Sequence, residues 1–202
     1  MVYSVGRGVR AGGERPARAV RAGRTAGRER RGDGMGYWGY FVVGRSVRPL
    51  TETEALTGVA GELRQRTSAP DGWQVWEFPS ADGDVGSMNT LARETGAPAL
   101  FGYVMDGACV VVEAAAPESG AWTTCLARAA TARYLGAGDA GLTLEDYFLP
   151  PDEASARAVA WAAEAGREAD PSALLEVLTA DGDEVAENLL FRLLDRLGVV
   201  PL

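Results

Sequence analysis

The hydrophobic residues after position 35 follow two kinds of spacing. Alternation of hydrophobic and polar residues is typical of β-strands, and hydrophobic residues every three or four positions are typical of amphipathic helices. In the first half of the chain these patterns predict the order β-α-β-α-β-β over residues 37–43, 52–66, 73–78, 84–95, 99–105 and 108–114. The last two strands are joined by Asp106 and Gly107, which suit the left-handed backbone of a type I′ hairpin.

The helix predicted over residues 52–66 depends on a capping signal. Thr51 and Glu54 are three residues apart, so each side chain can accept a hydrogen bond from the other residue's free backbone N–H. Leucine and valine residues then follow at helical spacing.

After Pro117 the pattern predicts helices alone. They cover residues 122–135, a short turn at 144–148, and longer segments at 151–165, 171–178 and 183–198. The last helix carries a leucine-rich stripe, and we expect it to pack against the preceding helix as an antiparallel pair. The prediction is an α/β (α+β) fold, in which a small mixed sheet of about four strands is followed by a helical C-terminal half.

Charge divides the chain into unlike parts. Residues 1–34 hold nine arginines against three acidic residues, a net charge of +6, and contain no Leu, Ile, Phe or Trp. Such a segment buries too little apolar surface to offset its ordering entropy, so we expect a disordered arm. It could bind nucleic acid or an acidic surface, or be upstream sequence translated from Met1 when Met35 is the true start. We predict an α/β domain over 35–117 and a helical region over 118–202 packed on it.

The remaining 168 residues carry eleven arginines and 25 acidic residues, a net charge of -14. The chain has no histidine, lysine or isoleucine and only two asparagines, which indicates a GC-rich bacterial gene. These absences exclude Ser-His-Asp triads, histidine zinc sites, P-loops and Schiff bases. Because phosphate backbones repel an acidic surface, we expect no nucleic-acid binding by the folded part. We predict no cofactor and no metal site.

Three further features bear on location and cofactor binding. No run of 18 apolar residues is present, which predicts a cytoplasmic protein without a membrane span. Cys109 and Cys125 stand among apolar residues, and we expect free buried thiols. Gly136, Gly138 and Gly141 have the spacing of a phosphate-binding fingerprint, but a predicted helix precedes them where that motif needs a strand. We therefore expect a flexible loop between helices.

Four charged residues are candidates for chemistry. Glu77 and Glu113 each lie in a predicted strand among apolar residues, so burial could perturb their carboxyl groups for acid–base work. The alternative is that each lies on a solvated face of the sheet. Arg45 and Arg48 follow the first strand, where they could bind an anion or simply occupy a surface turn.

The tryptophans are candidates for contact with a partner. Trp73 and Trp76 are three residues apart in one predicted strand, so they face opposite sides of the sheet, and we expect at most one in the core. The other could anchor a partner or be buried by a covering helix. Trp122, in the second half, is a further candidate contact.

These features favour binding over catalysis. Our leading hypothesis is a cytoplasmic, non-enzymatic protein whose acidic surface and exposed tryptophan dock on a basic protein partner, as in an immunity-type antagonist of a nuclease toxin. One alternative is a small-ligand-binding protein or a carboxylate-based enzyme using Glu77 and Glu113, and another is that the helical tail serves as a structural adaptor. The enzyme requires both carboxylates on one face and within about 10 Å of each other. The sequence leaves the identity of the partner and the oligomeric state open.

Overall fold

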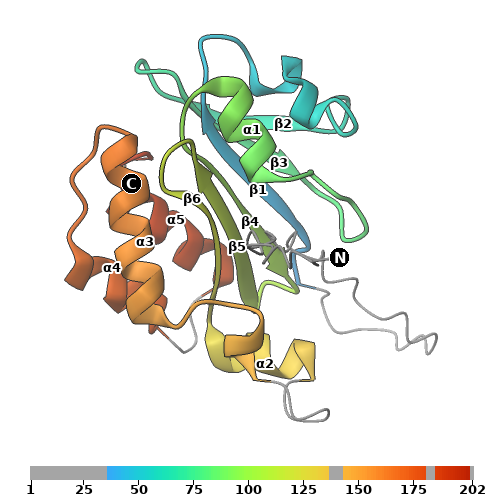
Figure 1. Cartoon of the computed structure of the whole chain (residues 1–202). Helices are drawn as coiled ribbons and strands as arrows, with labels where there is room; N and C mark the ends of the chain where they lie inside the picture. The colour runs from blue at the N-terminus through green and yellow to red at the C-terminus, as the bar shows by residue number, and fades with distance from the viewer. Residues whose placement is uncertain (1–35, 137–142, 181–184, 201–202) are drawn as a thin grey trace, which may run out of the picture. The chain divides into compact units, whose positions relative to one another are not determined.

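A computed structural model gives the fold of residues 36–136, 143–180 and 185–200, which belong to one compact unit. Its centre is a six-stranded sheet with the order β2-β3-β1-β4-β5-β6, and every neighbouring pair is antiparallel (Figure 1). The strands are β1 (Gly39–Arg45), β2 (Arg64–Ser68), β3 (Trp73–Phe78), β4 (Ala99–Met105), β5 (Cys109–Ala116) and β6 (Gly120–Leu126). The wholly polar β2 forms one edge of the sheet, where all its side chains reach solvent.

Helices cover both faces of the sheet. The C-terminal helices lie on one face, as Figure 1 shows, and are α3 (Pro151–Glu164), α4 (Pro171–Leu178) and α5 (Ala186–Arg196). The opposite face carries α1 (Met88–Thr95) and the 3₁₀ turns η1 (Leu50–Glu52) and η2 (Glu54–Leu56). Near the end of β6, α2 (Arg128–Leu135) and η3 (Leu144–Asp146) complete the described elements.

The sheet separates two hydrophobic cores. The larger lies mainly under α3, α4 and α5, and the smaller lies under α1, η1 and η2. In the larger core the buried indole N–H of Trp161 donates to the carbonyls of Ala99, at 3.2 Å, and Ala115, at 3.0 Å, which ties α3 to two strands. A Cβ on Gly102 would lie 2.5 Å from Cδ2 of Leu190. The glycine therefore allows α5 to approach β4 closely.

Most of the locally coded elements are confirmed. The strands predicted near β1, β3, β4 and β5 are present, and φ is 55° at Asp106 and 61° at Gly107, the left-handed backbone that was predicted. The link is one residue longer than predicted, because Met105 pairs with Cys109 and Ala108 belongs to the turn. The predicted C-terminal helices are present as α3, α4 and α5, and Asp170 caps α4. Residues 183 and 184, where the last helix was predicted to begin, lie outside the described residues. The helix predicted from residue 84 begins four residues later, because Ser87 caps it, and it ends at the left-handed Gly96.

The helix predicted over residues 52–66 is wrong. This segment forms η1, η2 and turns, and then enters β2. The Thr51–Glu54 capping box does not form, because the carboxylate of Glu94 accepts the backbone N–H groups of Glu54, at 2.8 Å, and Ala55, at 2.9 Å. The apolar residues are buried as the pattern implied, but the end of the segment pairs with the outer edge of β3. Tertiary pairing therefore overrides the helical spacing.

The helix predicted over residues 122–135 is only half right. Its first part is β6, which pairs with β5 along its whole length, and only the second part is a helix, α2. Ala127 separates them with a left-handed φ of 52°. In β6, Trp122 and Leu126 point into the larger core whereas Cys125 belongs to a small cluster on the other face. The alternation of inward and outward side chains covers only a few residues of β6, and the alanine-rich stretch that follows has the composition of a helix, so the sequence pattern favoured one continuous helix.

The α+β class is confirmed, but the sheet has six strands and not about four, and it is wholly antiparallel and not mixed. The arm predicted over residues 1–34 lies outside the described residues, as do Gly138 and Gly141. Gly136 ends α2, so a helix and not a strand precedes the glycine-rich segment. Within the described ranges, every helix is too short or too polar to cross a membrane.

Candidate functional site

The predicted tryptophan anchors are all buried. Trp73 is 1% exposed, Trp76 is 9% exposed and Trp122 is 4% exposed. Trp73 and Trp76 do point to opposite sides of β3, but helices or turns cover both sides. The expectation that at most one of them is in the core is therefore wrong, and none of the three rings presents a face that could anchor a partner.

The carboxylate of Glu77 lies on the α5 side of the sheet. It accepts the hydroxyl of Tyr37 at 2.8 Å and pairs with Nε of Arg66 at 3.4 Å. Burial and this hydrogen bond raise the pKa of Tyr37, so the phenol stays protonated and donates. Glu77 therefore has a structural role, in which it joins β3 to the segment before β1.

The carboxylate of Glu113 lies on the opposite face. The strand register places Glu77 in line with Val112, and Glu113 is the next residue along β5. Three strand spacings separate the two glutamates, about 14 Å. Glu113 accepts the backbone N–H of Met88 at 2.9 Å, and burial raises the pKa of its carboxyl group. The structure thus does not form the two-carboxylate site, and Glu113 instead anchors the start of α1 to the sheet.

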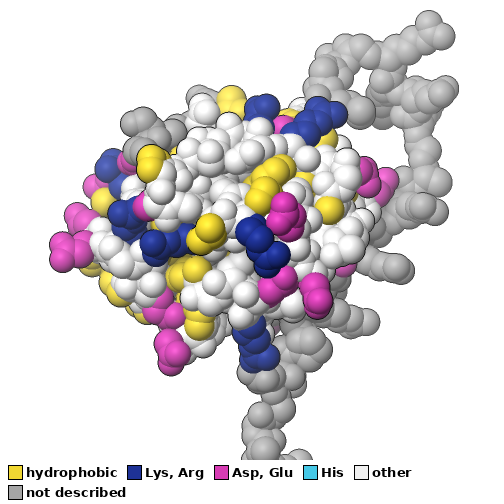
Figure 2. All heavy atoms as spheres, turned by 90° about the horizontal axis from the view of Figure 1, so that it is seen from above, with side chains coloured by type: hydrophobic (Ala, Val, Ile, Leu, Met, Phe, Trp, Pro, Cys, Tyr) yellow, Lys and Arg dark blue, Asp and Glu magenta, His cyan; other side chains and the backbone are white. Residues whose placement is uncertain are grey.

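One of the two predicted arginines, Arg45, lines an open hollow of about 630 Å³ next to the turn between β2 and β3. Arg45 donates from Nε to the carbonyl of Asp71 at 2.9 Å, while the carboxylate of Asp71 pairs with Arg167. Arg48 is exposed but does not line the hollow. The side of the molecule in Figure 2 mixes basic and acidic side chains. Because both Asp71 and Arg45 line the hollow, their opposite charges offset each other, and the hollow does not favour an anion over a cation.

A set of aromatic side chains that the sequence predictions did not include gathers on the α1 side of the sheet and on α2. We call it the aromatic patch, and it consists of Trp38, Tyr40, Phe101, Tyr103 and Tyr134. Tyr40 and Tyr103 are directly opposite each other on β1 and β4 and stack with ring centroids 4.3 Å apart. Four members are half-buried, and Tyr134 is 42% exposed. The patch is thus continuous and open to solvent.

Ring contacts and hydroxyl hydrogen bonds hold the patch in one arrangement. The ring of Trp38 lies 6.2 Å from that of Tyr103 and 6.0 Å from that of Tyr134, the second pair being nearly perpendicular at 87°. Tyr40 donates to the carbonyl of Gly83 and Tyr103 to that of Ala81, both at 2.9 Å. A side chain fixed in this way loses little further entropy when a partner binds.

Carboxylates border the aromatic patch. Asp82 and Asp84 are exposed in the loop that receives the two tyrosine hydroxyls, and Asp106 accepts the hydroxyl of Tyr134 at 2.8 Å. Burial raises the pKa of Tyr40 and Tyr103, and the nearby aspartates raise it further. Burial and the bond to Asp106 raise the pKa of Tyr134 to about 12. At neutral pH the tyrosines are therefore neutral, and the negative charge of the patch is on its border.

The described residues offer little that would support other chemistry. No group of three His, Cys, Asp or Glu side chains within them could hold a metal ion. Cys109 and Cys125 are free and buried, as predicted, and burial raises the pKa of Cys125 to about 11. Such a thiol carries almost no thiolate at neutral pH and is a poor nucleophile.

The alternation of aromatic residues contained a signal for part of the patch. Trp38 and Tyr40 are two residues apart, as are Phe101 and Tyr103, and this spacing places each pair on one face of a strand. Tyr134 reaches the patch only because α2 packs at the end of the sheet. Comparison of the chain with protein-family models, curated proteins and solved structures finds no match.

Proposed function

We propose that this chain is a cytoplasmic, non-enzymatic interaction protein that binds a basic protein partner through the aromatic patch and its acidic border. Its most concrete form is an immunity-type antagonist that covers the basic surface of a toxin, such as a nuclease. The observation that carries the proposal is the joint placement of five partly exposed aromatic rings and three bordering aspartates on one surface.

Three physical arguments support this assignment. Tyrosine and tryptophan are the side chains most enriched at the centres of protein interfaces, because they bury a large area with few rotatable bonds. The net charge of -14 after residue 34 attracts a basic partner and speeds its association. The same charge repels nucleic acid, so a nuclease partner would be bound in place of its substrate.

The proposal is tested by affinity purification of the full chain from the native host. The patch variant replaces Trp38 and Tyr134 with alanine. The matched control replaces Tyr147 with alanine, because Tyr147 is 41% exposed, close to the 42% of Tyr134, and lies in the turn after η3. We expect wild type and control to retain one identified protein of high isoelectric point at low salt, and the patch variant to lose it.

Two results would overturn the proposal. One is that no basic protein is retained by the wild type at low ionic strength. The other is that the patch variant and the Tyr147→Ala control retain the same protein in the same amount. Circular dichroism of both variants shows that the comparison is between folded proteins.

A further inference from the structure

The Trp38–Tyr134 corner of the aromatic patch carries the carboxylate of Asp106. Oδ1 of Asp106 accepts the backbone N–H of Gly36 at 2.8 Å, and Oδ2 accepts the hydroxyl of Tyr134 at 2.8 Å. Each carboxylate oxygen can accept two hydrogen bonds, so each retains one position as far as the described residues are concerned. Asp106 is exposed at the tip of the hairpin between β4 and β5. Two adjacent acceptors of this kind match the paired N–H groups of a guanidinium.

The rings beside Asp106 are suited to a flat cation. Because the hydroxyl of Tyr134 is bonded to Asp106, its ring is held next to the carboxylate, with the ring of Trp38 nearly perpendicular to it. The faces of tryptophan and tyrosine attract cations, and a planar guanidinium can stack on such a face while its edge bonds to a carboxylate.

Two further charged groups act on this corner. Glu187 of α5 lies on the other side of the hairpin, where its Oε2 would be 3.9 Å from a Cβ on Gly107, and this buried oxygen has no hydrogen-bond partner in the described structure. Arg133, next to Tyr134 on α2, is exposed and opposes the negative potential. Among the described residues named here, the two carboxylates of Glu187 and Asp106 outweigh the one guanidinium of Arg133, so this part of the corner favours a cation.

We propose that the corner formed by Trp38, Asp106 and Tyr134 binds an arginine side chain of the partner, an assignment that rests on the proposed function. Arginine fits better than lysine. A lysine ammonium lacks both the planar face and the fixed pair of donors that the rings and the two carboxylate oxygens accept.

The test uses two probes, N-acetylated and amidated tetra-arginine and tetra-lysine peptides, titrated into the isotope-labelled full chain. Five tryptophans give five indole N–H signals, and a Trp38→Phe variant identifies the one from Trp38. We expect tetra-arginine to shift this signal saturably and to bind at least about threefold more tightly than tetra-lysine.

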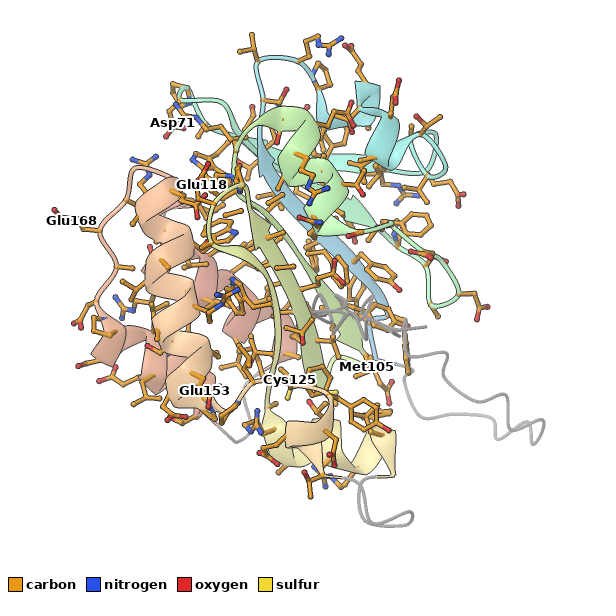
Figure 3. The ribbon with its side chains drawn as sticks, viewed as in Figure 1. Asp71, Met105, Glu118, Cys125, Glu153 and Glu168 are labelled. Atoms are coloured by element: carbon orange, nitrogen blue, oxygen red, sulfur yellow. The ribbon has the colours of Figure 1, made fainter. Side chains whose placement is uncertain are left out.

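The decisive variant is Asp106→Asn. Asparagine tolerates the left-handed backbone of this position and can still accept the N–H of Gly36, but it removes the charge. We expect it to weaken tetra-arginine binding about tenfold, as the loss of a charge-assisted pair does. Glu168→Gln is the control, because it changes the net charge equally and lies away from Met105, the neighbour of Asp106 (Figure 3). Tyr134→Leu is a second variant that removes one ring and leaves the hairpin intact.

The inference is overturned if the two peptides bind equally. It is also overturned if Asp106→Asn and Tyr134→Leu bind tetra-arginine as the Glu168→Gln control does, since the binding would then be a general effect of negative charge. Loss of the native partner from the patch variant without a preference for arginine would leave the proposed function standing and remove only the arginine site. A preference for arginine without any native basic partner would leave the corner as an arginine-binding site and remove the proposed function.

Discussion

The side chain of Gln74 offers a strong test of how tertiary contacts shape the arginine-bearing loop after β1. Its Nε2 donates to the carbonyls of Ser46, at 3.0 Å, and Arg48, at 2.8 Å. Its Oε1 accepts the backbone N–H of Leu50, at 3.1 Å, and the indole N–H of Trp76, at 2.9 Å. One buried amide thus fixes both the loop and the second tryptophan of β3.

Substitution of Gln74 by methionine keeps the length of the side chain and removes all four hydrogen bonds. The N–H groups of Leu50 and Trp76 are buried, so each is left without a partner at a cost of about 1–3 kcal/mol. The carbonyls of Ser46 and Arg48 are closer to solvent and can bind water. We therefore expect the free energy of unfolding to fall by about 2–6 kcal/mol, a large part of the 5–15 kcal/mol of a typical domain.

The assay is urea denaturation followed by tryptophan fluorescence. With an m-value of about 2 kcal/mol/M, the midpoint should fall by roughly 1–3 M. Gln65→Met is the matched control, since Gln65 is exposed on β2 and its substitution should change stability by less than about 0.5 kcal/mol. The reasoning is refuted if Gln74→Met unfolds within about 0.5 kcal/mol of the wild type.

Three other substitutions test the packing and the buried carboxylate. Gly102→Val should lower the free energy of unfolding in urea by about 1–3 kcal/mol, because the valine side chain would overlap Leu190. A second substitution, Leu190→Ala, should restore part of this loss. No recovery in the double variant would contradict the close packing of α5 on β4. Trp161→Phe should lower the free energy of unfolding by about 1–2 kcal/mol, because the two hydrogen bonds of the indole N–H are lost. A variant as stable as the wild type would argue against these two bonds. Glu113→Gln keeps an acceptor for Met88 but cannot ionise. Burial raises the pKa of Glu113 in the folded state, so the contribution of this group to wild-type stability falls as the pH rises from 4.5 through the pKa of the folded state. The variant should therefore become more stable relative to the wild type as the pH rises over that range, as measured by urea denaturation. A stability difference that does not change with pH would contradict the burial of this carboxyl group.

Much of the local structure could be predicted because its causes are local. The hairpin at Asp106 and Gly107 requires left-handed residues at two adjacent positions, and few residue types adopt that backbone easily. The cap of α4 by Asp170 likewise depends on a side chain two residues from the N–H that it accepts. Interactions of this range are contained in a short stretch of sequence, so the residue pattern is enough to predict them.

The edge strands could not be predicted because their causes are distant. Residues 64–68 have no alternating hydrophobic pattern, and they form β2 because the edge of β3 offers backbone groups that need partners. The predicted two-carboxylate site fails for the same reason, because it too depends on contacts between distant parts of the chain. Glu77 and Glu113 were separated by strand parity in a sheet whose order the sequence does not state.

The sequence by itself determined the class of fold, the position of most turns and caps, the acidic charge after residue 34 and the absence of histidine and lysine chemistry. Only the tertiary structure decided which aromatic rings reach solvent. It buried Trp73 and Trp76 under layers on both faces of β3 and left Trp38 and Tyr134 in contact at the surface. Exposure depends on what covers each face of the sheet, and the covering elements come from parts of the chain far apart in sequence.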